Sequence, residues 1–516
     1  MEREFKQNTR SFSLPPEASF FDSLGDYVAS YMRHCGGFKS PLSLVNRAEL
    51  FLARAFAKLP IAQSMSIVTE HTTPPNWQVL LNYLFTEKVI KSPRFESVRQ
   101  PNSLPPLVTF NLQAVFDQEK TDGRVLVKPI IGSGTSSTTE ESYAKAVGEV
   151  LERWVLTIYR RQDIRLETFK SLRRAGHTAL DPLQMNGFLP DLEAKHKNYR
   201  RSHDTIYGWV KGQELIHNTR AYIPAQAVFW NYKFNPALGE GVLIQPTTNG
   251  AAGHYTYERA VLSAVYELIE RDGFLIYWLN TISPPILDVS QIGEGPLREM
   301  IEKLHQCGLH PIFLDTTTDV GVPSCICVLI DERGDEPFVM VSAATGFGGE
   351  DLLLSSLTGA ILLVGGYSDV PRFVLPPDYE GPTSDFEVGQ KDRINLWKGR
   401  DMLEAFRFFI SGPQVPLEES AFGKETCQFS STKEELASLI ERFGKLGEGY
   451  EIYIYEAKHE ILTKLGYHVV QAVVPQLMPM YLREEFATHD SRRLREVPQK
   501  LGFIKTTLNP HPHPFP

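Results

Sequence analysis

The apolar positions in the first part of the chain recur at helical spacing. Residues 20–34 and 42–58 each carry apolar side chains three or four positions apart, so we predict two amphipathic helices there. Two consecutive prolines, Pro74 and Pro75, interrupt this region, because proline fixes φ and removes a backbone donor. Residues 1–90 are therefore expected to form a mostly helical extension, and partner docking is one role that such an extension could serve.

From about residue 91 onward, the pattern mixes strands with helices. Ser431 followed by Glu434 fits a capping box, which predicts a helix from there to about residue 443. Residues 376–395 are polar and contain prolines, so we expect a long surface loop. Apolar runs predict strands at 108–116, 222–232, 310–314, 324–330, 450–455 and 468–474, and a helix at 296–307. The prediction for residues 91–516 is a mixed α/β domain, with mixed sheets flanked by helices.

The composition narrows the classes of function. The 516 residues include 53 Lys and Arg against 62 Asp and Glu, a formal net charge of −9. No basic run with interleaved aromatic residues occurs, so nucleic-acid binding is a poor hypothesis. The charged N-terminus is unlike a signal peptide, and no apolar stretch is long enough to span a bilayer. We therefore expect no association with a membrane.

The cysteines indicate the cellular compartment. They are five and scattered, at Cys35, Cys307, Cys325, Cys327 and Cys427. An odd, dispersed set predicts reduced thiols and a cytoplasmic protein. No Cys-x-x-Cys pair occurs, so a structural zinc site is not expected. Within the strand predicted at 324–330, Cys325 and Cys327 share one face, which we expect to be buried.

One motif occurs twice along the chain. A segment of small residues at 134–139 precedes a helical pattern with the sequence Glu-x-x-Glu-Arg at 149–153. A second such segment at 247–253 precedes the same sequence at 267–271. Two copies are too few for a solenoid repeat, so a repeat architecture is not expected.

The repeated motif has a specific chemical interpretation. Glutamates three positions apart lie on one face of a helix, where their carboxylates repel each other. If both pairs face a partly buried cleft they need cations, and Mg²⁺, which prefers oxygen ligands, fits. Mg²⁺ usually accompanies phosphates, which loop N–H groups and Arg153 or Arg271 could bind. The alternative is a solvated, salt-bridged helix face that binds no ligand.

Other common nucleotide and hydrolase motifs are missing from the sequence. No Gly-x-x-x-x-Gly-Lys-Ser/Thr occurs, which excludes a P-loop. Gly346-Phe347-Gly348 lacks the third glycine and the acidic partner of a dinucleotide site. Neither His-Glu-x-x-His nor Gly-x-Ser-x-Gly is present. Ser/His/Asp catalysis therefore has no local support in the sequence.

The last residues, 509–516, alternate proline with other residues. Such a segment should hold a stiff polyproline II conformation, which can thread into a cleft at little entropic cost. The alternatives are a disordered end or a docking peptide for another protein. From the pattern alone, His511 and His513 are expected to be exposed tail residues.

Together these residues resemble the YcaO family, whose signature is two acidic helices that bind ATP through Mg²⁺ without a P-loop. The resemblance rests on 247–250 with 267–272, on the motif at 149–153, and on Val-Val-Pro-Gln-Leu-Met-Pro-Met-Tyr at 473–481. The closing Pro512-x-Pro514-x-Pro516 is the hallmark of the azoline-forming branch. The resemblance covers about residue 91 to the end of the sequence.

The resemblance implies roles for individual residues. It implies that ATP and Mg²⁺ are the cofactors and that the tail points into the active site, with the Pro516 carboxylate near the reacting amide. The implied metal ligands are Glu149, Glu152, Glu267 and Glu270; Glu258 joins them only if its helix begins after it. The implied nucleotide contacts are Asn249, Arg271, Ser133 and Arg153, and the implied catalytic tail residues are Pro512, Pro514 and Pro516.

The sequence also departs from the family pattern at three positions. Arg259 stands where many relatives have a metal-binding Glu. Ser133 stands between two glycines where lysine is common, and Gly359 lies in a helix that often carries Arg and Glu. These departures keep open a non-catalytic docking scaffold of the same complex as an alternative to an enzyme.

The resemblance implies an ATP-dependent peptide cyclodehydratase, which closes Cys, Ser or Thr of a ribosomal precursor peptide onto the preceding amide to give thiazolines or oxazolines. A thioamide- or amidine-forming YcaO enzyme is a further alternative. Because no zinc-bearing leader-binding segment is visible, a separate partner resembling ubiquitin-activating enzymes is implied, and a flavin-dependent azoline dehydrogenase is a second candidate partner. A homodimer or hetero-oligomer is expected.

Overall fold

The computed structural model describes residues 12–13, 84, 86, 90, 94–99, 107–116, 129–136, 138–333, 336–367, 370–379, 381, 388–424 and 428–515. The two helices predicted within residues 20–58 lie outside these ranges, as do Cys35, Cys427 and Pro516. The chain folds into two compact units, Met1–Arg99 with Val108–Trp154, and Gln100–Leu107 with Val155–Pro516. We call them unit 1 and unit 2. The predicted domain division at residue 90 stays a prediction.

Unit 1 contains an antiparallel sheet and the helix that carries the first copy of the motif. The strand order is β1-β2-β3-β4. The elements are β1 (Phe12–Ser13), β2 (Arg94–Arg99), β3 (Val108–Ala114), β4 (Ile130–Ser136) and α4 (Thr139–Val155). Phe116 stacks on Trp154 of α4, with ring centroids 4.6 Å apart. The predicted strand at 108–116 and the helix of the first motif are thereby confirmed.

Glycines in β4 let the strand lie directly against α4. A Cβ at Gly134 would lie 1.8 Å from the carbonyl oxygen of Ser142, and one at Gly132 would lie 2.4 Å from that of Ala146. No side chain fits into such a gap. Part of the segment expected to be a phosphate-binding loop is therefore a strand, and its glycines serve helix packing.

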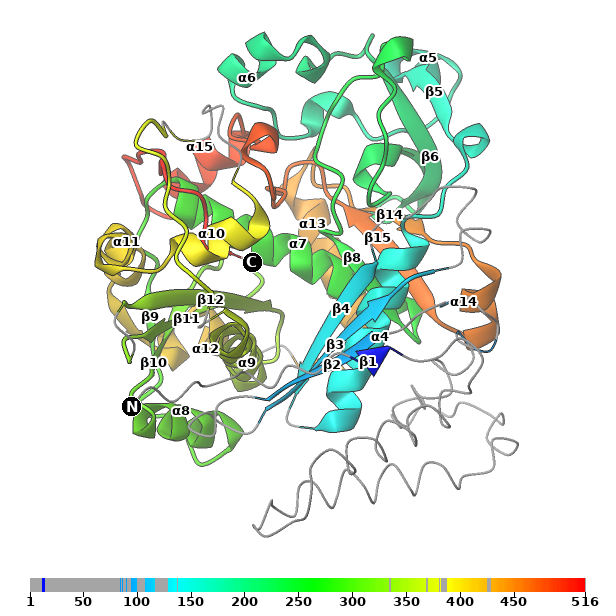
Figure 1. Ribbon diagram of the computed structural model, residues 1–516. Coiled ribbons are helices and arrows are strands. Elements are labelled where there is room, and N and C mark those ends of the chain that lie inside the picture. Colours follow the sequence, from blue (N-terminus) through cyan, green and yellow to red (C-terminus); the bar gives the residue numbers. More distant parts are fainter. Residues whose placement is uncertain are drawn as a thin grey trace. The chain divides into compact units, whose positions relative to one another are not determined.

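Unit 2 is built on two sheets with helices between and around them (Figure 1). The six-stranded sheet is antiparallel, in the order β5-β6-β14-β15-β8 with β7 beside β6; the five-stranded sheet has the order β12-β11-β10-β9-β13, in which β13 runs parallel to β9. The strands of unit 2 are β5 (Arg165–Thr168), β6 (Ile206–Glu214), β7 (Thr219–Pro224), β8 (Ala251–His254), β9 (Ile286–Asp288), β10 (His310–Asp315), β11 (Ser324–Asp331), β12 (Phe338–Thr345), β13 (Gln414–Pro416), β14 (Tyr453–Glu456) and β15 (His468–Val473). Its helices are α5 (Phe169–Arg174), α6 (Pro190–Lys195), α7 (Tyr257–Leu279), α8 (Pro296–Gln306), α9 (Glu350–Tyr367), α10 (Gln390–Leu396), α11 (Arg400–Phe406), α12 (Ala421–Lys424), α13 (Thr432–Leu446), α14 (Glu460–Leu465) and α15 (Arg492–Lys500).

Helix α7 is the central element of unit 2 and carries the second copy of the motif. Its first half packs with β8 and β15 of the six-stranded sheet. Its second half packs with β11 and β12 of the five-stranded sheet. A helix of 23 residues spans about 35 Å, long enough to join both cores. The motif at 267–271 lies where one core gives way to the other.

The five-stranded sheet is buried on both faces, which explains its continuous apolar strands. Ile326 and Val328 of β11 face the core of α7. Cys325 and Cys327 alternate with them and face α9 and α8, fully buried as predicted. Strands covered on both sides read as unbroken apolar runs. The predictions at 310–314 and 324–330 are confirmed for the same reason.

Other local predictions had mixed outcomes. The capping box is confirmed in part, because the Ser431 hydroxyl accepts the N–H of Glu434 at 3.3 Å, while the Glu434 carboxylate returns to Ser430. The strand predicted at 222–232 is too long: β7 ends at Pro224, and a 3₁₀ turn follows. The loop predicted at 376–395 is wrong at its end, because 390–396 form α10, whose Arg393 is fully buried. Pattern alone does not show that a charged residue is paired inside the core.

Candidate functional site

The second copy of the motif places two carboxylates and a guanidinium on one side of α7. Nη2 of Arg271 lies 3.4 Å from Oε1 of Glu267, and Nη1 lies 3.4 Å from Oε1 of Glu270. The three side chains are 18%, 29% and 15% exposed for Arg271, Glu267 and Glu270. One guanidinium is thus shared between two carboxylates that remain partly open to solvent.

The carboxyl group of Glu270 is poorly solvated. Burial, opposed by the positive charge of Arg271 and helped by the negative charge of Glu267, raises its pKa to about 7. A carboxyl group with a pKa near 7 is partly protonated at physiological pH, and a nearby cation favours its charged form. Glu270 is therefore suited to bind a positively charged ligand.

The segment before β8 contacts the same motif. The backbone N–H of Gly250 donates to Oε2 of Glu267 at 3.0 Å. Gly250 has φ of 82°, and a Cβ there would lie 2.7 Å from the carbonyl oxygen of Ala472, so only glycine fits. The amide of Gln471 donates to the carbonyl of Asn249 at 2.6 Å, and Oδ1 of Asn249 is buried without a hydrogen-bond partner in the described chain. Asn249 thus holds an open acceptor beside the motif.

The first copy of the motif, in unit 1, repeats this arrangement. Oε2 of Glu149 accepts the backbone N–H of Ser133, and Arg153 forms an ion pair with Oε1 of Glu149 at 2.6 Å. Glu152 follows Glu149 by three residues on α4. Arg153 also donates to the carbonyl of Ile131 on β4. In both copies the first glutamate binds a backbone N–H of the preceding segment and the arginine four residues later.

The two copies of the motif therefore share a hydrogen-bonding pattern as well as a sequence. The N–H donor precedes the first glutamate by 16 residues in one copy and by 17 in the other. Ser133 lies in the middle of β4 with its side chain exposed, on the face away from the glycines. The two sets of residues belong to separate units of the chain.

Two positions that depart from the family pattern, Arg259 and Gly359, have structural partners here. Arg259 lies 3.9 Å from Oε2 of Glu435 on α13, and Glu435 also accepts the hydroxyl of Tyr266 at 2.6 Å. A Cβ at Gly359 would lie 2.1 Å from Oγ of Ser342, so α9 packs tightly on β12 there. Helix α7 begins at Tyr257, before Glu258 rather than after it. Glu258 is nine residues from Glu267, half a turn out of phase, so the condition for its joining the ligands is not met.

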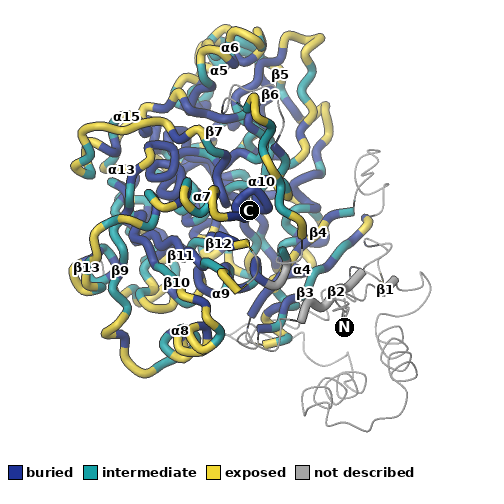
Figure 2. Tube along the Cα trace, turned by 60° about the vertical axis from the view of Figure 1, so that its left-hand side comes forward, coloured by how far each residue is buried: buried dark blue, intermediate teal, exposed yellow. Residues whose placement is uncertain are grey.

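The proline tail is part of the interior of unit 2. Residues 512–515 are buried, as the dark blue tube leading to the C mark shows (Figure 2). His513 is fully buried and His511 is half-buried, so the expectation that both are exposed is wrong. The ring of Phe515 is 4% exposed, and the guanidinium carbon of Arg271 lies 4.1 Å from its centroid. The tail therefore ends beside the motif of α7; of its three candidate catalytic prolines, Pro512 and Pro514 are buried and Pro516 lies outside the described ranges.

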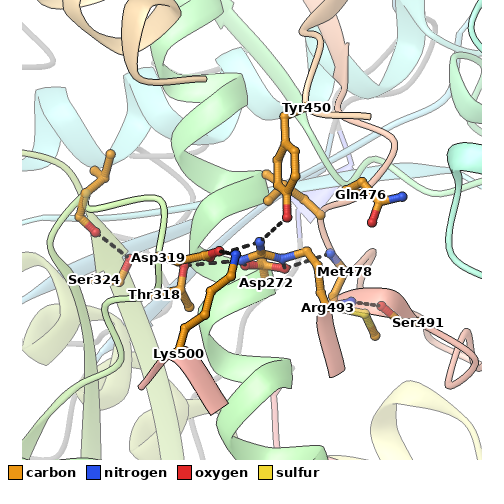
Figure 3. Close-up of polar contacts among 12 residues, drawn as sticks. Asp272, Thr318, Asp319, Ser324, Tyr450, Gln476, Met478, Ser491, Arg493 and Lys500 are labelled. Carbon is orange, nitrogen blue, oxygen red and sulfur yellow. Dashed lines mark hydrogen bonds and ion pairs between the residues drawn. The ribbon is translucent and has the colours of Figure 1, made fainter. Parts of the chain in front are cut away.

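A buried ion-pair network next to the motif escaped the sequence interpretation (Figure 3). Arg493 of α15 binds Asp272 through two nitrogens, with Nε 2.7 Å from Oδ1, and both side chains are fully buried. Nη1 of Arg493 also lies 3.0 Å from Oδ1 of Asp319 and donates to the hydroxyl of Tyr450 at 2.8 Å. The N–H of Met478 donates to Asp272 at 2.9 Å. An acidic residue directly after Arg271 in an apolar helix was the available signal for this network.

A second buried ion pair lies beside the tail. Nη2 of Arg393 lies 3.1 Å from Oε1 of Glu484, with 0% and 3% of the side chains exposed. The guanidinium of Arg393 lies over the ring of Tyr481, 5.5 Å from its centroid. Burial lowers the pKa of His513 well below its usual range, and the positive charge of Arg393 acts in the same direction. His513 is therefore neutral.

The donor set of α7 fits Mg²⁺ bound together with phosphates. No three His, Cys, Asp or Glu side chains gather into a metal site within the described ranges. Mg²⁺ rarely needs such a cage, because it usually keeps several waters and binds one or two carboxylates plus substrate phosphates. Glu267 and Glu270 supply oxygen donors that are partly exposed, and Arg271 supplies an anion contact. The chemistry of these side chains agrees with such a site.

Comparison with known proteins agrees with a site for Mg²⁺ and phosphates. A model of the family described as YcaO cyclodehydratase, ATP- and Mg²⁺-binding, matches residues 133–478. An uncharacterised protein of Methanothermobacter thermautotrophicus is 27% identical over 132 residues, which are 26% of this chain and 34% of that protein. This chain therefore spans about a third of that relative. No helix within the described residues is both long and apolar enough to cross a membrane.

Solved structures share the fold. A heterocyclase in complex with substrate and cofactor superposes with a TM-score of 0.62 at 20% identity, covering 81% of this chain and 54% of the other. YcaO from Methanopyrus kandleri, bound with AMPPCP and Mg²⁺, gives 0.50 at 19% identity and covers 74% and 86%. A chain of the E. coli microcin synthetase McbBCD complex with pro-MccB17 bound gives 0.50 at 14% identity and covers 83% and 97%.

The matched region spans about two thirds of the sequence and contains both Glu-x-x-Glu-Arg helices, the second half of β4 and the segment before β8. Given this match and the shared fold, the chain belongs to the YcaO cyclodehydratase family.

Proposed function

We propose that this chain is an ATP- and Mg²⁺-dependent cyclodehydratase that forms thiazolines or oxazolines from Cys, Ser or Thr of a ribosomal precursor peptide. The observation that carries the proposal is the contact of Phe515 with Arg271. It joins the two features that resemble the azoline-forming branch, the proline tail and the acidic helix. A solvated tail or a docking peptide would not be buried against the motif.

In the proposed reaction, the side-chain sulfur or oxygen attacks the preceding amide carbon. The amide oxygen then takes the γ-phosphoryl group that Mg²⁺-ATP supplies, and it leaves as phosphate while the heteroatom and the amide nitrogen lose their protons. The peptide loses one water, and ATP becomes ADP and phosphate. The protein must hold the amide oxygen and the γ-phosphoryl group close, in line and with their charge neutralised.

The residues of the chain divide these tasks in the proposal. The proposed Mg²⁺ ligands are the glutamates of the two motifs, Glu149 and Glu152 on α4 and Glu267 and Glu270 on α7. Arg271 contacts phosphate, and the unpartnered Oδ1 of Asn249 is available to the nucleotide. Ser133 and Arg153 are further nucleotide contacts, and Pro512, Pro514 and Pro516 position the tail at the reacting amide.

Activity is proposed to require partner proteins. A chain of the E. coli microcin synthetase McbBCD complex with pro-MccB17 bound resembles this one in fold, which supports action within an assembly. We propose a separate leader-binding partner, and a flavin-dependent dehydrogenase as a further component. Efficient, leader-dependent cyclisation by this chain alone would contradict the requirement for a partner.

The scaffold alternative has its own structural support. Arg259 is engaged by Glu435 rather than by an acidic site, and Gly359 is held against Ser342 with no room for a side chain. A chain that had lost turnover could keep both features. Release of ADP in the presence of precursor peptide and partner separates the enzyme from the scaffold, and product mass separates loss of water from thioamide or amidine formation.

The decisive experiment changes the second motif. Glu267→Gln and Glu270→Gln remove the charge but keep the side-chain volume, so phosphate release and peptide modification should both be lost while the fold is retained. The matched control is Glu302→Gln, which removes an exposed carboxylate paired with Arg298 at the same helical spacing. Normal turnover in Glu267→Gln would refute the assignment, and inactivity of the control would show that the assay reports folding instead.

A further inference from the structure

The proline tail runs back along α7 from its C-terminal end toward Arg271. The N–H of Asn509 donates to the carbonyl of Leu279 at 2.9 Å, and its side-chain amide donates to the carbonyl of Trp278 at 3.3 Å. Asn509 thus satisfies the carbonyl of Leu279, which the end of the helix leaves open. The ring of Phe515 marks the other end of this path, over Arg271.

These two end points do not determine how the tail lies between them. Leu279 and Arg271 are eight residues apart, about 12 Å along a helix axis. The six steps from Asn509 to Phe515 span about 19 Å in polyproline II conformation. The tail is longer than the path, and prolines supply no N–H groups to hold it in place. A slip by one residue would move the tail end by about 3 Å.

His513 provides an intermediate attachment. Its Nε2 lies 2.9 Å from the carbonyl oxygen of Tyr481. A carbonyl can only accept, so Nε2 carries the proton and Nδ1 is the deprotonated nitrogen. The ring also lies edge-on to Tyr481, with centroids 5.1 Å apart, and edge-on to Phe274 of α7 at 6.0 Å. A single imidazole therefore joins the tail both to Tyr481 and to α7.

Tyr481 is itself tied to α7. It ends the segment 473–481, in which the N–H of Met478 donates to Asp272. Asp272 is the neighbour of Arg271 and is held by Arg493 (Figure 3). The chain of contacts from His513 through Tyr481, Met478 and Asp272 therefore returns to the motif at which the tail ends. An attachment to Tyr481 sets the tail position relative to the motif.

We propose that His513 is a positioning residue, which fixes the register of the tail so that its last residues reach the reacting amide. This inference rests on the proposed cyclodehydratase function. The prolines make the tail stiff, and the residues between them, above all His513, decide where it stops. A displacement of about 1 Å can cost roughly a hundredfold in rate, so a one-residue slip would be severe.

The test separates the hydrogen bond from the bulk of the ring. His513→Phe keeps a planar ring and removes the donor, whereas His513→Gln keeps an N–H at about the position of Nε2. The control is His511→Phe, because the His511 ring contacts Trp397 and has no hydrogen-bond partner within the described residues. The enzyme is the full chain with its partner, Mg²⁺-ATP and a leader-bearing peptide rich in Cys, Ser and Thr.

We expect His513→Phe to lower kcat for peptide modification by roughly a hundredfold with an unchanged KM for ATP, and His513→Gln to recover most of it. His511→Phe should behave as the unaltered protein. Backbone amide exchange of the tail peptide should rise in His513→Phe and not in His513→Gln. Unchanged kcat in His513→Phe, or equal losses in the Phe and Gln variants, would overturn the positioning role.

The exchange measurement needs no catalysis, so it distinguishes this inference from the proposed function. If the unaltered protein modified no peptide, the proposed function would fail, while tail exchange in His513→Phe would still report the attachment. Tail exchange as slow in His513→Phe as in the unaltered protein would show that His513 does not hold the tail, whatever the activity.

Discussion

The guanidinium of Arg271 lies over the ring of Phe515, 4.1 Å from its centroid. Arg271 belongs to the acidic motif of α7, and Phe515 belongs to the proline tail, 244 positions further along the sequence. The same guanidinium also reaches Glu267 and Glu270. The tail thus contributes directly to the environment of the predicted nucleotide site.

This contact predicts the effect of changing the ring. Phe515→Leu keeps an apolar side chain and removes the aromatic face, which is worth about 0.5–2 kcal/mol to a nearby cation, or roughly 2- to 30-fold in rate. We expect peptide modification to fall within this range at saturating ATP, and Phe515→Trp to retain most of it. Equal rates for the Leu and Trp variants would show that only burial of the ring matters.

The Asp272–Arg493 pair predicts a loss of stability. Asp272→Asn removes one of the two negative charges that face the buried guanidinium of Arg493. Breaking a buried ion pair in this way typically lowers the free energy of unfolding by about 3–5 kcal/mol. The remaining contact of Arg493 with Asp319 favours the lower end of this range. The control is Asp490→Asn, which breaks an exposed pair with Arg495 and should cost less than about 1 kcal/mol. Denaturant unfolding followed by fluorescence measures both. Equal stabilities of the two variants would contradict a structural role of the buried network.

Some parts of this fold could be predicted from the sequence because their causes are local. The helices around Glu149 and Glu267 follow from apolar spacing, and β11 follows from its unbroken apolar run. The strand character of β4 could not be predicted, because Gly132 and Gly134 resemble a loop until the approach of α4 is known. A glycine pair is compatible with both uses, and only the packing decides between them.

The candidate site shows the same limit more clearly. The paired glutamates on α7 were predicted, because two carboxylates at helical spacing signal a cation. The partner of Asp272 could not be predicted, since Arg493 is 221 residues away and lies on another helix. Likewise, the burial of His513 depends on Tyr481 and Phe274 covering it. Contacts between distant segments leave no periodic trace in a sequence.

The close packing of β4 on α4 predicts a strong effect of a single methyl group. Gly134→Ala would place a Cβ against the backbone carbonyl of Ser142, which cannot move without shifting the helix. We expect a loss of about 1–3 kcal/mol of stability, as for other overpacked sites. The neighbouring Ser133→Ala removes an exposed side chain and should stay within about 0.5 kcal/mol. Thermal unfolding of the two variants tests this, and similar melting temperatures would refute the packing argument.

The buried His489 predicts a pH dependence of stability. Its Nε2 lies 3.1 Å from the hydroxyl of Tyr481, and burial lowers its pKa to about 4. In the unfolded chain a histidine has a pKa near 6.5. Between these values the unfolded state binds a proton that the folded state does not, so stability falls as the pH falls below about 6.5. His513, also buried beside Tyr481, acts in the same direction.

The variant His489→Gln measures how much His489 contributes to this pH dependence of stability. Between pH 7.5 and pH 5.5 the unaltered protein should lose about 1 kcal/mol more stability than His489→Gln, whose side chain does not titrate. Denaturant unfolding at the two pH values measures each loss. If His489→Gln lost stability with falling pH as steeply as the unaltered protein, His489 would have to be protonated inside the fold, which its burial against Tyr481 opposes.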